Sequence, residues 1–242
     1  MTWYEFFRRV VAVFIRAATR TEVVGRDRVP RDGPFILVAN HQSILDPLIV
    51  QVHCPRPLHT LTKSTQFNGT FFGWLMPRLN GIPTRRYRVD PQVVRVVLKR
   101  LGQGRGVGVY PEGERSWDGR LQPFRRGTVR LLLKAGVPVV PCGVVGSYDV
   151  WPRWSRTVRR RRVRLEFGEP IHWPAMDDRA RREAHLPDAM ETLRTRLAKL
   201  SDWTLLEKPG RTGGAGSSDP ASQEPPWLRD VPSPGDDSAG SS

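Results

Sequence analysis

The sequence predicts an α/β fold: a single domain with a largely parallel or mixed central sheet flanked by helices, preceded by an amphipathic N-terminal helix and followed by a disordered tail. Two observations lead to this prediction. Short apolar runs of strand length alternate along the chain with segments of helical periodicity, which is typical of parallel strands joined by helical crossovers. After Lys208 the composition shifts to Gly, Ser, Pro and Asp, which is typical of disorder.

Apolar runs and helical punctuation place the elements. The predicted strands are 35–39, 58–62, 107–110, 137–145 and 163–167. The predicted helices after them are 93–101, 128–135 and 187–200. Asp90 and Pro91 fit the N-cap and first position of the first of these helices, and Gly136 fits the end of the second. Ligands collect at the carboxyl ends of strands in such sheets, so polar clusters that follow the strands are candidate sites.

The chain is predicted to have three parts. Residues 1–20 form an amphipathic membrane-surface helix, residues 21–205 form a globular domain that is large enough for an enzyme, and residues 206–242 form a disordered tail. Apolar positions at helical spacing form one stripe: Trp3, Phe7, Val10, Val11, Phe14 and Ile15. Aromatic residues opposite arginines suit a helix that lies among lipid headgroups. The alternative is a helix that packs on the core and exposes a basic face to solvent.

Charge and cysteine content narrow the function classes. The net charge of +15 favours a polyanionic partner, which could be nucleic acid, an anionic lipid surface or a phosphorylated donor such as a coenzyme A thioester. Cys54 and Cys142 are too few for a disulfide framework and show no metal-ligand spacing. No run approaches the roughly 20 apolar residues of a spanning helix, and the apolar stretch 10–15 is short for a signal peptide. We therefore expect the protein at the cytoplasmic face of the cell membrane, peripheral or monotopic.

The first polar cluster, Asn-His-Gln-Ser-Ile-Leu-Asp-Pro at 40–47, follows the strand 35–39. Histidine is suited to take a hydroxyl proton near neutral pH, and a carboxylate can orient it. His41 and Asp46 would lie about 140° apart on one continuous helix, but they can meet if His41 is in the loop and Asp46 begins a helix, as Pro47 favours. The alternative is that Asp46 is only the N-cap of that helix.

Two further clusters carry charges suited to a phosphate. In Pro-Glu-Gly-Glu-Arg-Ser at 111–116, Gly113 lets the backbone approach a ligand, Arg115 offers a forked donor, and Glu112 could hold that arginine or a substrate hydroxyl. The alternative is a polar turn with a surface ion pair. Arginines at 85–86 follow a strand-like turn, with Lys63 and the aromatic run 71–74 before them. Taken alone, these residues are better interpreted as solvated arginines and core aromatics than as a site.

Together the clusters resemble the glycerolipid acyltransferase family typified by 1-acylglycerol-3-phosphate acyltransferase, from about residue 20 to about residue 200. Four blocks match in order. The first is Asn-His-x-Ser-x-x-Asp at 40–46, and the second comprises Lys63, Phe67, Phe-Phe-Gly-Trp at 71–74 and Ile-Pro-x-x-Arg at 82–86. The third is Pro-Glu-Gly-x-Arg-Ser at 111–116 with Phe-Arg-Arg-Gly at 124–127, and the fourth is Val-Pro-Val-Val-Pro at 137–141. Glu114 stands where the family usually has Thr, and Arg85 where it often has Asp.

The resemblance implies an O-acyltransferase that moves a fatty acyl group from a thioester donor, acyl-CoA or acyl carrier protein, to the free hydroxyl of lysophosphatidic acid (1-acylglycerol-3-phosphate) in phospholipid biosynthesis. It implies direct transfer, with His41 as the base and Asp46 as its orienting partner. The implied substrate-binding residues are Lys63, Arg86, Glu112, Gly113 and Arg115. No metal or cofactor is implied beyond the thioester co-substrate, and the implied partners are that donor, the lyso-lipid and an anionic membrane surface.

Other interpretations remain open at this point. The segment 151–164 carries seven arginines beside Trp151 and Trp154, so the chain could be a basic nucleic-acid-binding protein. It contains no recognised nucleic-acid-binding motif, and we interpret the arginines as a face toward anionic lipid. A non-catalytic membrane-binding relative and an acyltransferase for another lyso-lipid or a glycolipid are the further alternatives.

Overall fold

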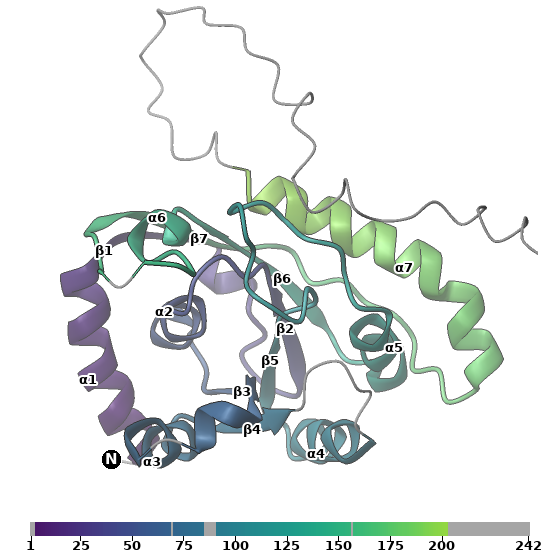
Figure 1. Cartoon of the computed structure of the whole chain (residues 1–242). Coiled ribbons are helices and arrows are strands. Elements are labelled where there is room, and N and C mark those ends of the chain that lie inside the picture. Colours follow the sequence, from purple (N-terminus) through teal and green to yellow (C-terminus); the bar gives the residue numbers. More distant parts are fainter. Residues whose placement is uncertain (1–2, 69, 85–90, 156, 203–242) are drawn as a thin grey trace, which may run out of the picture. The chain divides into compact units, whose positions relative to one another are not determined.

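One mixed β-sheet organises the chain (Figure 1). The computed structural model describes residues 3–68, 70–84, 91–155 and 157–202, which belong to the compact unit Met1–Glu207. In these ranges seven strands pair in the order β1-β7-β6-β2-β5-β3-β4. They are β1 Thr19–Val24, β2 Phe35–Ala39, β3 Leu58–Lys63, β4 Gly81–Thr84, β5 Gly106–Val109, β6 Val139–Val145 and β7 Arg161–Phe167. Neighbours are parallel except β6 and β7, which are antiparallel, so the predicted α/β fold with a largely parallel or mixed sheet is confirmed.

Helices cover both faces of this sheet (Figure 1). They are α1 Trp3–Ala18, α2 Asp46–His53, α3 Thr70–Arg78, α4 Pro91–Gly102, α5 Arg126–Ala135, α6 Ser147–Val150 and α7 Arg179–Leu200, with short 3₁₀ turns η1 Arg26–Arg28 and η2 Ser64–Phe67. α1 and α2 contribute to the hydrophobic cluster on one face, and α4, α5 and α7 to the cluster on the other. The predicted tail at 206–242 lies outside the described residues.

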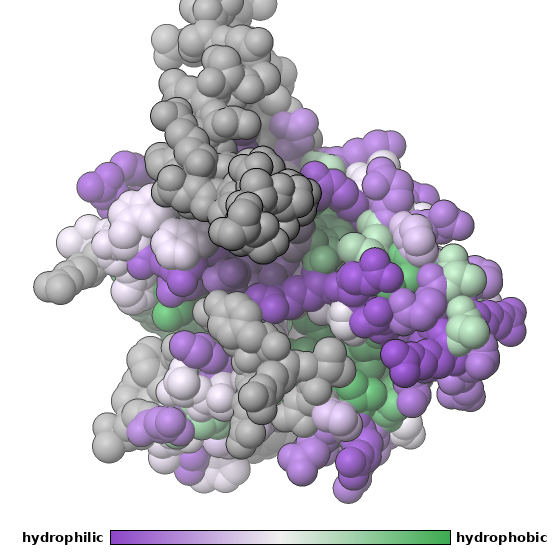
Figure 2. Space-filling view, turned by 45° about the vertical axis from the view of Figure 1, so that its right-hand side comes forward, coloured by the Kyte–Doolittle hydropathy of each residue, from purple (hydrophilic) through white to green (hydrophobic). Residues whose placement is uncertain are grey.

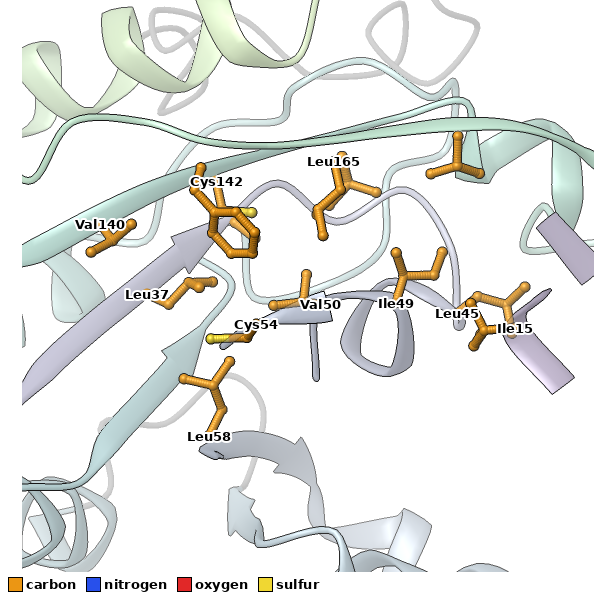
Figure 3. Packing of buried hydrophobic residues seen from close by; sticks show 14 of the residues in the cluster. Ile15, Leu37, Leu45, Ile49, Val50, Cys54, Leu58, Val140, Cys142 and Leu165 are labelled. Carbon is orange, nitrogen blue, oxygen red and sulfur yellow. The ribbon is translucent and has the colours of Figure 1, made fainter. Parts of the chain in front are cut away.

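The central strand β2 supplies both halves of the core because its residues point alternately to the two faces. Phe35 and Leu37 belong to the cluster shared with α1 and α2, whereas Ile36 and Val38 belong to the cluster shared with α4, α5 and α7. Figure 3 shows the first cluster, which includes Leu37 of β2 and Ile49 of α2. A parallel strand covered on both faces must be apolar throughout, and every residue of β2 is buried.

Several elements differ from the prediction, among them the helices α3 and α6, which were not predicted. The edge strands β1 and β4 were not predicted, because each is only partly buried and neither forms a continuous apolar run. The last helix begins at Arg179 rather than at 187. Asp178 caps it by accepting a hydrogen bond from the Arg181 amide at 2.7 Å. Pro187 therefore lies inside α7, where it lacks one backbone donor, and buried leucines on both sides of it keep the helix on the sheet.

Helix α1 carries one broad apolar stripe, part of which is buried against the protein and part of which is exposed. Its buried residues are Tyr4, Phe7, Ile15 and Ala18. Its exposed large apolar residues are Trp3, Phe6, Val10, Val13 and Phe14, which again follow helical spacing. The buried part packs against α2 and α3, as the core-packing interpretation expects, and the exposed part points outward. The opposite side of the molecule differs, because the side that carries α5 and α7 presents mostly hydrophilic residues (Figure 2).

Candidate active site

The loop that follows β2 begins with a side chain that continues the sheet. Asn40 Nδ2 donates to the carbonyl of Val144 at 2.8 Å, and the Val144 amide donates to Asn40 Oδ1 at 2.7 Å. The asparagine side chain thus mimics a strand neighbour of β6 at the point where β2 ends. This pairing fixes the main chain immediately before His41.

The structure brings His41 and Asp46 together. His41 Nδ1 lies 2.8 Å from Asp46 Oδ2, with His41 in the loop and Asp46 at the start of α2. An ionised carboxylate can only accept hydrogen bonds, so Nδ1 carries the proton and Nε2 of the neutral ring keeps its lone pair. The ring also lies against Tyr110, with 4.4 Å between ring centres and 32° between planes. His41 is thereby held in one orientation with one nitrogen available as a base.

Asp46 is fully buried, and four hydrogen-bond donors surround its carboxylate. Oδ2 accepts from the His41 ring and from the amides of Gln42 and Ser43 at 2.6 and 2.7 Å, while Oδ1 accepts from Ser147 Oγ at 2.5 Å. All four donors lie outside α2, whose N-cap is Leu45. The interpretation of Asp46 as the N-cap of its own helix is therefore wrong, because the carboxylate turns back to the loop before it.

The main chain of His41 is fixed by the loop that follows β5. The His41 amide donates to Glu112 Oε1 at 2.7 Å, and the His41 carbonyl accepts from the Ser116 amide at 2.7 Å. Glu112 Oε2 accepts from the amide of Gln122 at 2.9 Å. Glu112 is 4% exposed, and burial raises its pKa to about 8 although the two amides oppose the shift. Its carboxylate is thus engaged by main-chain donors.

Beside His41 lies a pocket that combines an apolar wall with two cations (Lys63 and Arg115). Its lining residues are His41, Ile44, Pro47, Leu48, Gln51, Leu61, Thr62, Lys63, Met76, Leu79, Gly81, Tyr110 and Arg115. Three residues predicted to be functional, His41, Lys63 and Arg115, therefore border one cavity. Such a cavity suits a ligand with an anionic head and an apolar body.

Other predicted residues are placed differently. Glu112 and Gly113 do not line this pocket. Gly113 has a φ of 75°, and a side chain there would collide with Arg125. Arg86 lies outside the described residues. Trp74 of the predicted aromatic run is 45% exposed and packs edge-on against Phe7, with 4.9 Å between ring centres.

The unusual acid Glu114 has a partner. Arg153 lies 3.5 Å from Glu114 Oε2 and 3.6 Å from the centre of the Trp117 ring. The negative charge that departs from the family pattern is thus balanced by a cation from the loop after α6. The other departure, Arg85, lies outside the described residues.

Several residues around His41 were missed by sequence reasoning. Asn40 was noted only as part of a motif, and Tyr110 only as the end of a strand. Ser147, which donates to Asp46, lies two residues after the end of β6. A polar residue just after a central strand was the one available signal for it, because the carboxyl ends of parallel strands share one edge of the sheet.

Two further observations bound the site and its surroundings. In the ranges that the structure covers, no group of three or more histidine, cysteine, aspartate or glutamate side chains could hold a metal ion. Within the same ranges, none of the helices combines the length and apolar character needed to cross a bilayer.

Comparisons with known proteins agree on one class of enzyme. A family model described as Acyltransferase matches residues 20–145. The chloroplastic 1-acyl-sn-glycerol-3-phosphate acyltransferase BAT2 of Brassica napus is 32% identical over 164 residues, which cover 65% of this chain and 47% of that protein. The 1-acyl-sn-glycerol-3-phosphate acyltransferase of Bacillus subtilis is 23% identical over 200 residues, which cover 82% of this chain and 92% of that protein. The 1-acyl-sn-glycerol-3-phosphate acyltransferase alpha of Ovis aries is 30% identical over 209 residues, which cover 81% of this chain and 71% of that protein. The chain spans about half the length of the plant relatives it matches.

A solved structure is also similar. The 1-acyl-sn-glycerophosphate (LPA) acyltransferase PlsC from Thermotoga maritima matches with a TM-score of 0.63 and 25% sequence identity, over 78% of each chain. The similarity therefore extends to the fold and covers most of the described residues.

Proposed function

Because the chain belongs to the acyltransferase family, we propose that it is an O-acyltransferase that esterifies the free hydroxyl of lysophosphatidic acid (1-acylglycerol-3-phosphate). The donor is a fatty acyl thioester of coenzyme A or acyl carrier protein, and the reaction belongs to phospholipid biosynthesis. The names of the relatives, which are 1-acyl-sn-glycerol-3-phosphate acyltransferases, support this acceptor. Family membership also weakens the alternative of a nucleic-acid-binding protein.

One observation carries the proposal: the His41 ring, held through Nδ1 by buried Asp46, borders a pocket that also contains Lys63 and Arg115. A base must lie within reach of the hydroxyl that it deprotonates, and the anionic head of the acceptor needs cations nearby. The pocket offers the base and the two cations at one end, and an apolar wall beyond these groups can hold a lipid chain.

In the proposed reaction, His41 Nε2 takes the proton of the acceptor hydroxyl while the oxygen attacks the thioester carbonyl carbon. The C–S bond then breaks, and the thiol leaving group takes the proton from His41. Asp46 holds the ring and stabilises the imidazolium while it exists. The attack is direct, so no acyl-enzyme forms.

The remaining predicted residues take two roles in this proposal. Lys63 and Arg115 bind the acceptor phosphate, for which the planar guanidinium of Arg115 offers a bidentate fork. Arg86 is expected from the resemblance to share this role. Glu112 is a positioning residue, since its carboxylate holds the main chain of His41, and Gly113 allows Arg125 to approach the same loop.

We also propose that the protein acts at the cytoplasmic face of the cell membrane, bound through the outward face of α1. That face exposes 72% of Trp3 and 68% of Val13, and helices with such a face lie in the bilayer interface. Trp3→Ser combined with Val13→Ser should lower co-sedimentation with anionic liposomes severalfold. Val96→Ser, at an exposed valine of α4, is the matched control and should bind as the unaltered protein does.

The acyl-transfer proposal is tested by mass spectrometry of the products formed from purified protein, an acyl-CoA and a panel of lyso-lipids. We expect phosphatidic acid from lysophosphatidic acid, and no product from a folded His41→Ala variant. Normal turnover by that variant would remove His41 from the mechanism. A product formed only from another lyso-lipid or a glycolipid would move the assignment to a different acceptor.

A further inference from the structure

A buried amide interrupts the apolar wall of the pocket beside His41. Gln51 of α2 is 6% exposed and lines that pocket. Around it the lining is apolar and includes Leu48, Leu61, Met76 and Leu79. A polar group in such surroundings is costly unless it is hydrogen-bonded, so the bonds that Gln51 makes decide what the position can do.

Only the nitrogen of the Gln51 side-chain amide forms hydrogen bonds within the described residues. Gln51 Nε2 donates to Thr60 Oγ1 at 3.0 Å and to the carbonyl of Leu79 at 3.3 Å, which uses both of its hydrogens. The carbonyl of Leu79 can only accept, so the amide cannot be turned the other way round. Gln51 Oε1 is then left buried with no hydrogen-bond partner among the residues that the structure describes.

The position of Gln51 along the pocket follows from the elements that carry it. Gln51 lies five residues after Asp46 on α2, a rise of about 8 Å. Its partner Thr60 lies three residues before Lys63 on β3, a distance of about 10 Å. His41 and Lys63 border the pocket at the carboxyl edge of the sheet, so Gln51 lies at the other end, on the order of 10 Å away.

We propose that Gln51 forms a polar subsite in this lipid pocket and accepts a hydrogen bond from a hydroxyl group carried near the middle of a bound acyl chain. The inference rests on the proposed acyl transfer, since it takes the pocket to hold a lipid chain whose reacting end is at His41. An unsubstituted chain leaves Oε1 without a donor, whereas a hydroxylated chain supplies one. Gln51 is thus a specificity-determining residue for hydroxylated over plain chains.

A water molecule is a poor substitute for that hydroxyl. Buried water is held where two to four polar groups surround it, and the wall near Gln51 is formed by leucines and Met76. A hydroxyl on a chain is already held in place by the apolar contacts of its own methylenes. Oε1 reaches it by a small rotation about the last side-chain torsion, which has a broad minimum in glutamine.

The experiment is a competition between two donors of equal length. Purified protein receives lysophosphatidic acid, stearoyl-CoA and a stearoyl-CoA that carries a hydroxyl near the middle of its chain, and mass spectrometry measures the ratio of the two products. A second arm places the same hydroxyl on the chain of the lysophosphatidic acid instead. The arm that shows a preference identifies which lipid occupies the pocket.

The unaltered protein should prefer the hydroxylated lipid in one arm by about threefold to tenfold, which corresponds to one net hydrogen bond. Gln51→Met, which keeps a linear side chain of similar volume, should abolish the preference. Met76→Leu is the matched control, because it changes the same wall without touching the amide, and it should keep the preference.

Each other outcome has a definite meaning. A product ratio near one in both arms of the unaltered protein overturns the subsite, even if Gln51→Met does not fold. An equal preference in the unaltered protein and in Gln51→Met overturns it as well. Product formation with no preference leaves the acyl transfer standing, whereas no product from any pair overturns the proposed function together with this inference.

Discussion

Two buried carboxylates serve the same histidine in different ways. Asp46 contacts the ring of His41, and Glu112 contacts its main chain. Asp46 accepts from four donors, one of them the Ser147 hydroxyl, whereas the Glu112 carboxylate accepts from two main-chain amides. Both side chains are almost completely removed from solvent.

The difference shows how a fold assigns tasks to similar groups. A buried carboxylate with few donors is dominated by the cost of losing water, and burial raises the pKa of Glu112 to about 8. A carboxylate enclosed by donors can remain a charged partner for an imidazolium. We therefore assign to Asp46 a part in the chemical step and to Glu112 the placing of the loop, and the predictions below separate the two.

The largest effect is expected from Asp46→Asn. Asparagine can keep its oxygen toward the amides of Gln42 and Ser43 and turn its amide group to Ser147, whose hydroxyl can accept as well as donate. The fold should therefore persist. The imidazolium of His41 loses its counter-charge, so kcat should fall by about a thousandfold or more. Steady-state kinetics and circular dichroism measure both effects, and a loss of kcat below about tenfold would contradict the assigned role.

A smaller loss of activity, with a distinct pH signature, is expected from Glu112→Gln. The NH₂ group of the glutamine would face one of the two main-chain N–H groups that now donate to Glu112, and two donors cannot form a hydrogen bond. One of the two hydrogen bonds is therefore lost, and kcat should fall about tenfold. The pKa of Glu112 is raised from 4.5 in the unfolded chain to about 8 in the fold. The stability contributed by its bound proton is complete below the unfolded value and is lost as pH rises toward about 8.

The control for this prediction is the unaltered protein over the same pH range. Its free energy of unfolding, from urea titrations, should fall more steeply between about pH 5 and about pH 8 than that of Glu112→Gln, because the glutamine does not titrate. Equal slopes for the two proteins would show that Glu112 does not titrate in this range.

How much of the fold was predictable depended on burial. β2 and β6 are covered on both faces and read as unbroken apolar runs, so they were found. β1 and β4 lie at the sheet edges, where polar residues are allowed and the pattern weakens. For α1, helical periodicity predicted the apolar stripe but could not tell which part of it packs on the protein.

The contacts of the candidate site also fall into those that the sequence could predict and those that it could not. The contact between His41 and Asp46 was predictable because the two residues are close in sequence. Pro47 also favours a helix that begins at Asp46, which leaves His41 in the loop before it. The contact of Ser147 with Asp46 spans 101 positions and depends on the pairing of β2 with β6. The hydrogen bonds of Glu112 to the main chain of His41 and Gln122 were not predictable. Every residue except proline carries a main-chain amide, so a sequence does not indicate which amides a carboxylate will bind.

The smallest expected effect tests whether the donors around Asp46 matter beyond stability. Ser147→Ala removes the bond to Asp46 Oδ1, which is 2.5 Å long and buried, and leaves an acceptor unsatisfied. We expect a loss of stability of about 1 to 3 kcal/mol and a fall in kcat of severalfold with KM unchanged, because the ring partner is less firmly placed. Thr19→Val, which deletes a buried hydroxyl bonded to the carbonyl of Ile15, is the matched control and should lower stability while kcat stays constant. If both variants lose stability and neither loses kcat, Ser147 serves the fold alone. The difference in role between Asp46 and Glu112 then depends only on which part of His41 each contacts, the ring or the main chain.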